Sequence, residues 1–434
     1  MQTITIVPIQ HSLAATVRVP GSKSLTNRAL LIAALADGTT QLTNALFSDD
    51  SRYFAKALQA LGFDLRLDDL RAEISVTGLG GRIPAQAAEL FIGNAGTAAR
   101  FLSAFLTLGS GEYILDGDAR MRERPIGDLV ASLESLGAKV EPVVKSAASL
   151  ENRKFICPPV KIIASGLPGG QTDIAGDISS QFLSALLMVA PYAQNSVEIS
   201  LSTELNSKPY VDMTLATMSD FGISIQREGY TRFSITPGRY TPRNTYAIEP
   251  DASAASYFFA APAILGGMVR IENIARQSKQ GDTAFVDVLA RMGCTVTDGA
   301  DFIEVTGPAT LQGVDVDMCD IPDTAQTLAA IAPFACSPTR IRGIASARVK
   351  ETDRVSATCA ELSRLGVQVE EHTDGMTIHP CVEIHPATIQ TYNDHRMAMA
   401  FALVGLRAPG VSIENPGCVS KTFPNYFETL ETLR

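Results

Sequence analysis

One short stretch mixes acids and bases in a pattern that suits proton transfer. Arg348 to Arg354 reads RVKETDR and has five charged residues in seven. As the start of a helix, it places Lys350 and Arg354 four residues apart on one face, with Glu351 beside them. A carboxylate held among cations is a candidate for acid–base chemistry. The alternative is a solvated helix face joined by surface ion pairs.

Two further acids stand immediately before alanine-rich apolar runs. Asp323 precedes TAQTLAAIA, and Asp394 precedes His395, Arg396 and MAMAFALV. An aspartate in that place caps the helix N-terminus by default. Asp323 becomes a second candidate for proton transfer if its helix points into a cleft.

The segment that begins at Gly21 joins a polar start, GSKS, to an apolar helix. Ser22 and Ser24 can cap free backbone N–H groups there, whereas Lys23 and Arg28 add positive charge that opposes the helix dipole. These opposed features suit an anion from outside the chain, such as a phosphate. GSKS lacks the spacing of a nucleotide-binding loop, so a capped helix with a solvated lysine is the alternative.

The same pattern of polar start and apolar helix occurs six times, at intervals of about 70 to 85 residues. Its copies begin at Gly21, Asn94, Asp177, Asp251, Asp323 and Asp394. Each apolar helix is predicted to lie inside a domain. A strand, an amphipathic helix and two further strands follow it in each complete repeat. Glycines end the amphipathic helices at Gly62, Gly137, Gly222, Gly293 and Gly366.

The sixth repeat lacks its last strands, and two strands, Thr3 to Ile9 and Ala14 to Val19, precede the first repeat. Residues 1–20 are therefore predicted to complete the last repeat. This gives an α/β fold of two lobes with three repeats each, one lobe at 21–245 and the other at 1–20 plus 246–434. A ligand site is expected between the lobes.

Basic residues concentrate at the repeat starts and before the amphipathic helices. They are Lys23, Arg28, Arg100, Arg120, Arg122, Arg124, Lys208, Arg348, Lys350, Arg354, Arg396 and Lys421. If the buried helices aim their N-termini at the expected site, these cations converge there. Such a set suits a ligand with several negative charges, for example phosphates and carboxylates.

Composition excludes several classes of protein. The 434 residues carry a net charge of -10 and no basic stripe, which argues against nucleic acid as a partner. The seven cysteines show no CxxC spacing, so neither a disulfide framework nor a zinc site is expected. The apolar runs are too short to span a bilayer, and the N-terminus lacks a signal-peptide layout. We expect a cytoplasmic protein without a membrane partner.

Ten stretches along the chain together resemble the enolpyruvyl transferases. They are PGSKSLTNRALL, GNAGTAARFL, GDARMRERPIGDLV, DISSQFLSALLM, SKPYVDMTL, EPDASAASYF, IPDTAQTL, RVKETDR, YNDHRMAMAF and KTFPNYF. The resemblance covers essentially the whole chain and keeps the family order. It implies an inverse α/β barrel of two lobes, each with three βαβαββ-type units around buried parallel helices.

Within the family, SKPY and KETDR favour the branch whose acceptor is shikimate 3-phosphate. That branch transfers the enolpyruvyl group of phosphoenolpyruvate to the 5-hydroxyl of the acceptor, releases phosphate, and serves aromatic amino acid biosynthesis. The branch that uses UDP-N-acetylglucosamine is the nearest alternative. Its members usually have a cysteine in the loop that matches Ala119 to Arg124, where this chain has none. A non-catalytic anion-binding relative is the other alternative.

The resemblance assigns a role to each matching residue. Glu351 would exchange the carbon-bound proton, Asp323 would take the hydroxyl proton, and Lys23 would neutralise the departing phosphate. Phosphoenolpyruvate would be held by Lys23, Asn94, Gly96, Arg124, Gln181, Arg354, Arg396 and Lys421. Shikimate 3-phosphate would be held by Ser24, Arg28, Ser179, Ser180, Gln181, Ser207, Tyr210, Asp323, Ser346 and Lys350. No metal or organic cofactor is implied, and we expect a monomer.

Some positions depart from the family pattern. Ser346 stands where asparagine is common, and Ala99 and Phe101 stand where methionine and proline are frequent, behind the phosphoenolpyruvate pocket. Sensitivity to the family's inhibitor, glyphosate, is therefore left open. The segment Lys145 to Pro159 is longer than a repeat requires.

Overall fold

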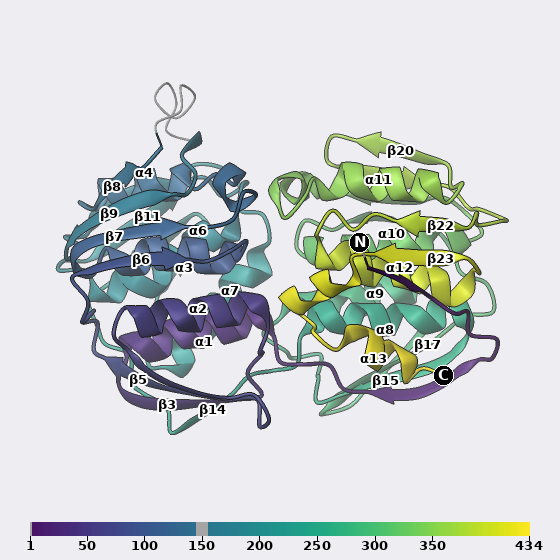
Figure 1. Cartoon of the computed structure of the whole chain (residues 1–434), viewed down its shortest axis with the longest axis horizontal. Coiled ribbons are helices and arrows are strands. Elements are labelled where there is room, and N and C mark those ends of the chain that lie inside the picture. The colour runs from purple at the N-terminus through teal and green to yellow at the C-terminus, as the bar shows by residue number, and fades with distance from the viewer. Residues whose placement is uncertain (1, 145–154) are drawn as a thin grey trace. The chain divides into compact units, whose positions relative to one another are not determined.

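The computed structural model describes residues 2–144 and 155–434, and the chain divides into two compact units (Figure 1). Unit 1 comprises Met1–Pro20 and Glu249–Arg434, and unit 2 comprises Gly21–Ile248. Of the long loop predicted at Lys145 to Pro159, residues 145–154 lie outside the described part. None of the helices in the described ranges is long and apolar enough to cross a membrane.

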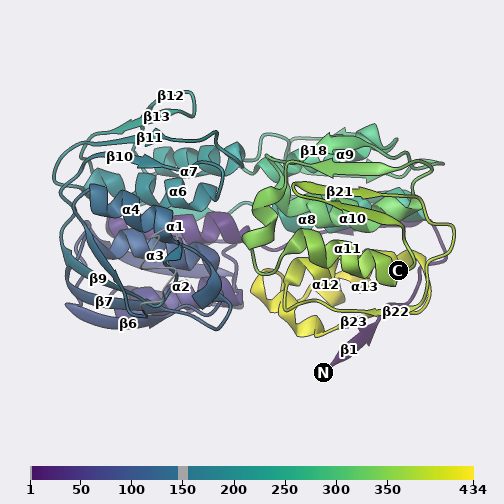
Figure 2. The same ribbon diagram turned by 90° about the horizontal axis from the view of Figure 1, so that it is seen from above.

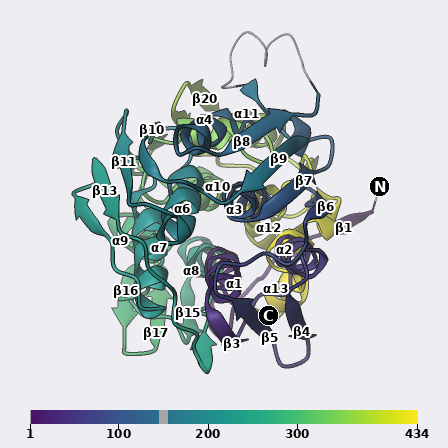
Figure 3. The same cartoon turned by 90° about the vertical axis from the view of Figure 1, so that its left-hand side faces the viewer.

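Unit 2 is built around three buried helices, α1 (Lys23–Leu35), α3 (Gly96–Leu106) and α6 (Ser180–Val189). Helix α3 packs against both others, and all of its residues are buried. Figure 3 shows the three helices close to end-on, with strands outside them. Each helix is apolar on nearly every side, which requires an interior position. The prediction of interior helices is confirmed here.

Amphipathic helices and short strands surround that core. The helices are α2 (Asp49–Ala60), α4 (Gly127–Ser135) and α7 (Lys208–Asp220). The strands are β3 (Asp37–Thr43), β4 (Asp64–Asp68), β5 (Glu73–Leu79), β6 (Ala87–Phe91), β7 (Ser110–Asp116), β8 (Lys139–Pro142), β9 (Val160–Ser165), β10 (Gly170–Ile174), β11 (Val197–Leu201), β12 (Gln226–Glu228), β13 (Arg232–Ile235) and β14 (Thr245–Ala247).

Unit 1 has the same plan around α8 (Ala252–Leu265), α10 (Ala325–Ile331) and α12 (His395–Arg407), which pack against one another. Its outer helices, seen in Figure 2, are α9 (Phe285–Arg291), α11 (Arg354–Arg364) and α13 (Tyr426–Glu431). Its strands are β1 (Thr3–Thr5), β2 (Leu13–Val17), β15 (Gly267–Glu272), β16 (Thr295–Asp298), β17 (Phe302–Thr306), β18 (Asp315–Asp317), β19 (Thr339–Arg342), β20 (Val369–His372), β21 (Gly375–Ile378), β22 (Ala387–Ile389) and β23 (Val411–Glu414).

The strands form six small sheets with one recurring order. In the sheet β6-β7-β9-β8, the edge strand β6 runs parallel to β7, and the other pairs are antiparallel. The four other four-stranded sheets repeat this order, and the sheet β1-β23-β22 has three strands. A parallel neighbour needs a crossover connection, and a buried helix supplies it in most repeats. The predicted repeated unit is confirmed.

The first two strands complete two different repeats, which corrects the prediction that residues 1–20 complete the last one. Strand β1 pairs antiparallel with β23 of the sixth repeat, with Ile4 opposite Ile413. Strand β2 instead pairs parallel with β15 of the fourth repeat, with Ala15 opposite Val269. The chain therefore leaves unit 1 between a parallel edge strand, β2, and the helix α1.

The glycines that end the amphipathic helices have the predicted role. Gly62, Gly137, Gly222, Gly293 and Gly366 all have positive φ, between 83° and 102°. An L-residue with a side chain rarely adopts this conformation, so glycine stops the helix and turns the chain into the next strand.

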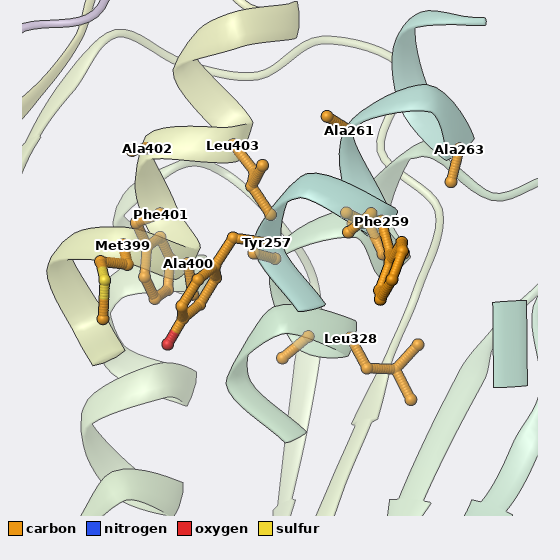
Figure 4. Packing of buried hydrophobic residues seen from close by; sticks show 14 of the residues in the cluster. Tyr257, Phe259, Ala261, Ala263, Leu328, Met399, Ala400, Phe401, Ala402 and Leu403 are labelled. Atoms are coloured by element: carbon orange, nitrogen blue, oxygen red, sulfur yellow. The ribbon is translucent and has the colours of Figure 1, made fainter. Parts of the chain in front are cut away.

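The core of unit 1 is formed mainly where its three buried helices meet. Figure 4 shows Tyr257 and Phe259 of α8, Leu328 of α10, and Met399 and Phe401 of α12 together in this core. The helix interiors are mostly apolar, and the charged residues of each helix are concentrated near its N-terminal end, with Arg407 at the end of α12 as an exception. The first turns therefore carry the candidate site.

Candidate active site

Arg354 is the centre of a buried cluster of acids in unit 1. It begins α11, and its side chain is 4% exposed. Nη2 donates to Glu351 Oε2 at 2.8 Å, Nε donates to Asp394 Oδ2 at 2.8 Å, and Nη1 donates to Asp323 Oδ1 at 3.2 Å. Burial alone would lower the pKa of Arg354, but the three carboxylates outweigh burial and raise it. The guanidinium therefore stays charged and fixes three acids around itself.

Asp323 connects that cluster to two further cations. Its Oδ2 accepts a hydrogen bond of 2.7 Å from Arg396 Nη2, and its Oδ1 lies 3.8 Å from Lys350 Nζ. Arg396 also lies 3.5 Å from the hydroxyl of Tyr257, a buried residue of α8. The Asp323 side chain is 17% exposed, which leaves it more accessible than the buried Asp394. Asp323 is therefore the acid of this group that an incoming hydroxyl can reach more readily.

Glu351 and Lys421 complete the set in unit 1. Lys421 ends the 3-10 helix Pro416–Lys421, and its Nζ lies 3.9 Å from Glu351 Oε1. Both residues are buried. Glu351 thus lies between a lysine and an arginine, an arrangement that holds a carboxylate in one orientation.

A fourth acid, Asp282, is buried close to the cluster. It accepts a hydrogen bond from Ser253 Oγ, in the first turn of α8. Burial and then the nearby charge of Asp323 raise the pKa of Asp282 to about 7. This residue was not among the predicted site residues, because nothing in its sequence context, QGD, distinguishes it from a surface turn.

The buried helices of the two units differ in their caps. Asp251 accepts from the Ala254 N–H at 2.9 Å, and Asp394 accepts from the Arg396 N–H at 2.9 Å, so acids cap α8 and α12. The expectation that Asp323 caps α10 is wrong, because Thr324 stands at that cap and makes no side-chain cap hydrogen bond. In unit 2 the caps are Ser22, Ala95 and Ser179. An external anion at the helix starts of unit 2 therefore meets no carboxylate cap.

Arg28 is a fully buried cation of unit 2. Its Nε donates to Thr214 Oγ1 at 2.7 Å, and Nη2 donates to the Tyr210 carbonyl at 3.1 Å. Nη1 donates to the carbonyl of Ser24, one turn earlier, at 3.0 Å. The guanidinium also lies over the ring of Phe101, 5.4 Å from its centroid. Burial lowers the pKa of Arg28 to about 10.

Arg124 fits against the start of α3 because residue 96 is glycine. Its Nη1 donates to Asn94 Oδ1 at 2.8 Å and to the Asn94 carbonyl at 3.1 Å. A Cβ on Gly96 would lie 2.6 Å from Arg124 Nη2. The GNAG sequence therefore lets a buried guanidinium approach the first turn of a helix, where N–H groups are also available.

Lys23 is held by an acid that was not among the predicted site residues. Its Nζ lies 3.5 Å from Asp50 Oδ2, and Asp50 is buried in the first turn of α2. Asp50 belongs to a run, SDDS, that reads as an ordinary helix start. The pairing of Lys23 with Asp50 becomes evident only in the structure, where the first turn of α2 lies next to the start of α1.

The other predicted ligands of unit 2 lie at the starts of α1, α6 and α7. Ser179 caps α6 through the Gln181 N–H at 3.3 Å, and Ser180 is the first residue of that helix. Ser207 precedes α7 in a left-handed conformation, and its carbonyl accepts from the N–H of Tyr210 at 3.0 Å. In unit 1, Ser346 lies in a 3-10 helix, Ala345–Val349.

The prediction that RVKETDR starts one helix is wrong. The 3-10 helix ends at Val349, Lys350 has φ -84° and ψ -149°, and α11 begins only at Arg354. Asp353 causes the late start, because its carboxylate accepts from the N–H groups of Val355 and Ser356 and caps the helix. Lys350 and Arg354 nevertheless both reach Asp323.

Several predicted cations have partners elsewhere. Arg348 pairs with Asp353 at 2.9 Å and with Glu371 at 2.8 Å, so it joins α11 to β20. Arg120, Arg122 and Lys208 pair with the acids Glu123, Asp116 and Glu204. Arg100 donates to the carbonyls of Gly96 and Pro125. The structure therefore gives these five residues contacts that support the fold.

Asp394 has a larger role than the cap predicted for it, since it also binds Arg354 through two hydrogen bonds. The sequence offered no sign of this, because 40 residues separate the two.

Within residues 2–144 and 155–434, no group of three or more His, Cys, Asp or Glu could hold a metal ion.

Known structures share this fold over its full length. A solved structure of EPSP synthase from Acinetobacter baumannii matches with a TM-score of 0.81 and 25% sequence identity, covering 100% of this chain and 98% of that one. Fold and site thus define an enzyme built from six repeats, three in each unit, with charged residues gathered at helix starts.

Sequence comparison gives the family. Residues 7–430 match EPSP synthase (3-phosphoshikimate 1-carboxyvinyltransferase). A protein of that second name from Trichormus variabilis is 51% identical over 428 residues, 98% of each chain. Another from Sulfurovum sp. is 50% identical over 435 residues, 100% of this chain and 99% of its own. The chain belongs to the EPSP synthase family, and the predicted resemblance is confirmed.

Proposed function

We propose that the chain transfers the enolpyruvyl group of phosphoenolpyruvate to the 5-hydroxyl of shikimate 3-phosphate and releases phosphate. The observation that carries the proposal is the placement of two acids, Asp323 and Glu351, on one buried arginine, Arg354. Membership of the family indicates the substrates, and the cluster contains the acids that could transfer the protons of such a reaction.

The proposed reaction has an addition and an elimination. In the addition, the methylene carbon of phosphoenolpyruvate gains a proton, the 5-hydroxyl loses one, and a bond forms between the hydroxyl oxygen and the central carbon. In the elimination, the new methyl group loses a proton and the carbon–oxygen bond to phosphate breaks. Proton transfer by positioned side chains suits both steps.

We assign the carbon-bound proton to Glu351 and the hydroxyl proton to Asp323. Glu351 is fixed between Arg354 and Lys421, which suits repeated transfer to and from one carbon atom. Asp323 is the more exposed acid and is held by Arg396, Arg354 and Lys350. We assign the carboxylate of phosphoenolpyruvate to Arg354 and Arg396, since guanidinium groups bind carboxylates through paired hydrogen bonds.

We assign the phosphate groups mainly to unit 2. Lys23 and Arg124 would hold the phosphate of phosphoenolpyruvate, together with Asn94, Gly96, Gln181 and Lys421. Arg28 and the starts of α6 and α7 would hold shikimate 3-phosphate, through Ser24, Ser179, Ser180, Ser207 and Tyr210, with Ser346 and Lys350 from unit 1. Cations and neutral helix caps favour anions at such places. Lys23 would neutralise the departing phosphate.

The test is phosphate release by the purified chain with phosphoenolpyruvate and each of two acceptors. We expect release with shikimate 3-phosphate and none with UDP-N-acetylglucosamine. Release with UDP-N-acetylglucosamine alone would assign the chain to the other branch, and no release with either would leave an anion-binding protein.

We also propose that the chain acts as a monomer in the cytoplasm. Its seven cysteines are all free thiols, which suits a reducing compartment. Sedimentation equilibrium of the purified chain checks the first part, and localisation of a tagged chain in its host checks the second.

A further inference from the structure

A cavity of about 940 Å³ lies in unit 1 at the C-terminal ends of the three buried helices. Its walls come from the end of α8, from the end of the 3-10 helix Ala332–Phe334 and the two residues after it, and from the end of α12. The loops 308–311 and 380–386 complete the walls. The cluster around Arg354 lies at the other end of these helices. A 13-residue helix such as α12 is about 20 Å long, so the cavity is separate from the candidate active site.

Unit 2 closes the corresponding end of its own helices with two tyrosines. Tyr192 follows α6 in a 3-10 helix, Ala190–Tyr192, and its hydroxyl donates to the Leu35 carbonyl at the end of α1. The hydroxyl of Tyr240 donates to the Met188 carbonyl near the end of α6 at 2.9 Å. The two rings lie 5.9 Å apart, and Tyr240 is 2% exposed. Rings and hydroxyls together cover the carbonyl ends of the helices.

The repeats allow a residue-by-residue comparison with unit 1. Ala332–Phe334 reads APF where Ala190–Tyr192 reads APY. The N–H of Gly238 donates to the Pro191 carbonyl at 2.8 Å, and the N–H of Cys381 donates to the Pro333 carbonyl at 2.8 Å. Cys381 therefore corresponds to Gly238, and Phe334 to Tyr192.

A second pair of hydrogen bonds fixes the other end of the compared segment. The N–H of Thr241 donates to the Phe221 carbonyl, and the N–H of His385 donates to the Leu365 carbonyl; both acceptors precede a helix-ending glycine. Between these anchors, unit 2 has Arg239 and Tyr240, whereas unit 1 has Val382, Glu383 and Ile384. No ring lies in that segment of unit 1, and all three of its residues line the cavity.

We propose that this cavity binds a small aromatic molecule that carries a hydroxyl group, whose ring takes the place that Tyr240 takes in unit 2. The lining suits a ring that carries a polar group, because Leu265, Leu311, Phe334 and five prolines stand beside the polar residues Thr310, Glu383 and Arg407. The volume is within the usual range for ligand pockets. A ligand hydroxyl in that place would donate to a carbonyl near the end of α10, as the Tyr240 hydroxyl donates to the Met188 carbonyl near the end of α6.

The test uses 4-fluorophenol, which represents the ring and hydroxyl of a tyrosine side chain, with the full-length chain. Fluorine NMR should show saturable broadening of its signal. The same titration should slow modification of the exposed thiol Cys336, which lines the cavity, by a disulfide reagent, and Cys336→Ser identifies that thiol. Fluorobenzene, which lacks the hydroxyl, should bind about tenfold more weakly, the effect of one lost hydrogen bond.

Two matched variants locate the bound probe. Thr310 is exposed and lines the cavity, so Thr310→Trp should obstruct it and abolish saturable binding, whereas Thr310→Ser should retain it. Ala309→Trp, at the neighbouring lining position, repeats the test if the first variant folds poorly. Phosphoenolpyruvate and shikimate 3-phosphate should not displace the probe. Absence of saturable binding, binding that survives both tryptophans, or displacement by the two substrates would overturn the proposal.

Discussion

Arg354 and Glu351 form a 2.8 Å ion pair in unit 1, and both side chains are less than a tenth exposed. The same arginine binds Asp394 and Asp323. One cation therefore positions the two acids that the proposed reaction uses, and a third acid anchors that cation to the first turn of α12.

Glu351→Gln should abolish turnover while ligand binding changes little. The amide keeps the shape of the side chain but cannot carry the proton, so kcat should fall by at least about 100-fold. Steady-state phosphate release and calorimetric titration with shikimate 3-phosphate measure the two effects. Glu370→Gln, on the exposed strand β20, is the matched control and should leave both unchanged. Equal losses of binding and turnover in Glu351→Gln would show an architectural role.

Asp394→Asn should destabilise unit 1 much more than Asp353→Asn. Both aspartates cap helices, but Asp394 is buried against Arg354, and Asp353 is partly exposed. We expect the free energy of unfolding to fall by about 3 kcal/mol in the first variant and by less than about 1 kcal/mol in the second. Urea unfolding measures both, and equal effects would mean that the buried pair adds nothing beyond the cap.

The sequence predicts the helices of the fold but not the partners of Arg354. The six buried helices follow from their apolar composition, and the helix ends follow from glycines such as Gly62. The partners of Arg354 do not follow, because Asp323 and Asp394 lie 31 and 40 residues away. Likewise, the pairing of β1 with β23 joins residues more than 400 positions apart, and no local pattern specifies it.

The wrong helix start at RVKETDR has a local cause. Spacing alone placed Lys350 and Arg354 on one face, but the Asp353 side chain captures two backbone N–H groups and starts α11 at the next residue. Capping thus outweighed charge spacing at this site.

Arg28→Lys should destabilise unit 2. The guanidinium donates to Thr214, Ser184 and two carbonyls, and an ammonium group cannot reproduce that geometry. Acceptors left without a donor should lower the free energy of unfolding by about 2 kcal/mol, measured by urea unfolding. Arg18→Lys is the control, because the Arg18 side chain is 75% exposed, and it should change the free energy of unfolding by less than about 0.5 kcal/mol. Equal changes would contradict the buried role of Arg28.

Asp282 should make stability depend on pH. Its pKa in the folded chain is about 7, raised by burial and by Asp323, whereas an unfolded aspartate titrates near pH ~4. The folded state therefore binds the proton more tightly, so the contribution of Asp282 to stability is lost as pH rises from about 4 to about 7. Asp282→Asn should flatten this part of the melting-temperature profile. Asp287→Asn, on α9, is the control, and a profile unchanged by Asp282→Asn would contradict this account.

Deuterium incorporation during turnover tests the proposed chemistry most directly. With phosphoenolpyruvate and shikimate 3-phosphate in heavy water, the wild-type chain should place deuterium in the methylene group of the product, because the carbon is protonated by solvent-derived protons and later deprotonated. Proton NMR should show this for the wild type and not for Glu351→Gln. Product formation by the wild type without deuterium in its methylene group would contradict addition and elimination.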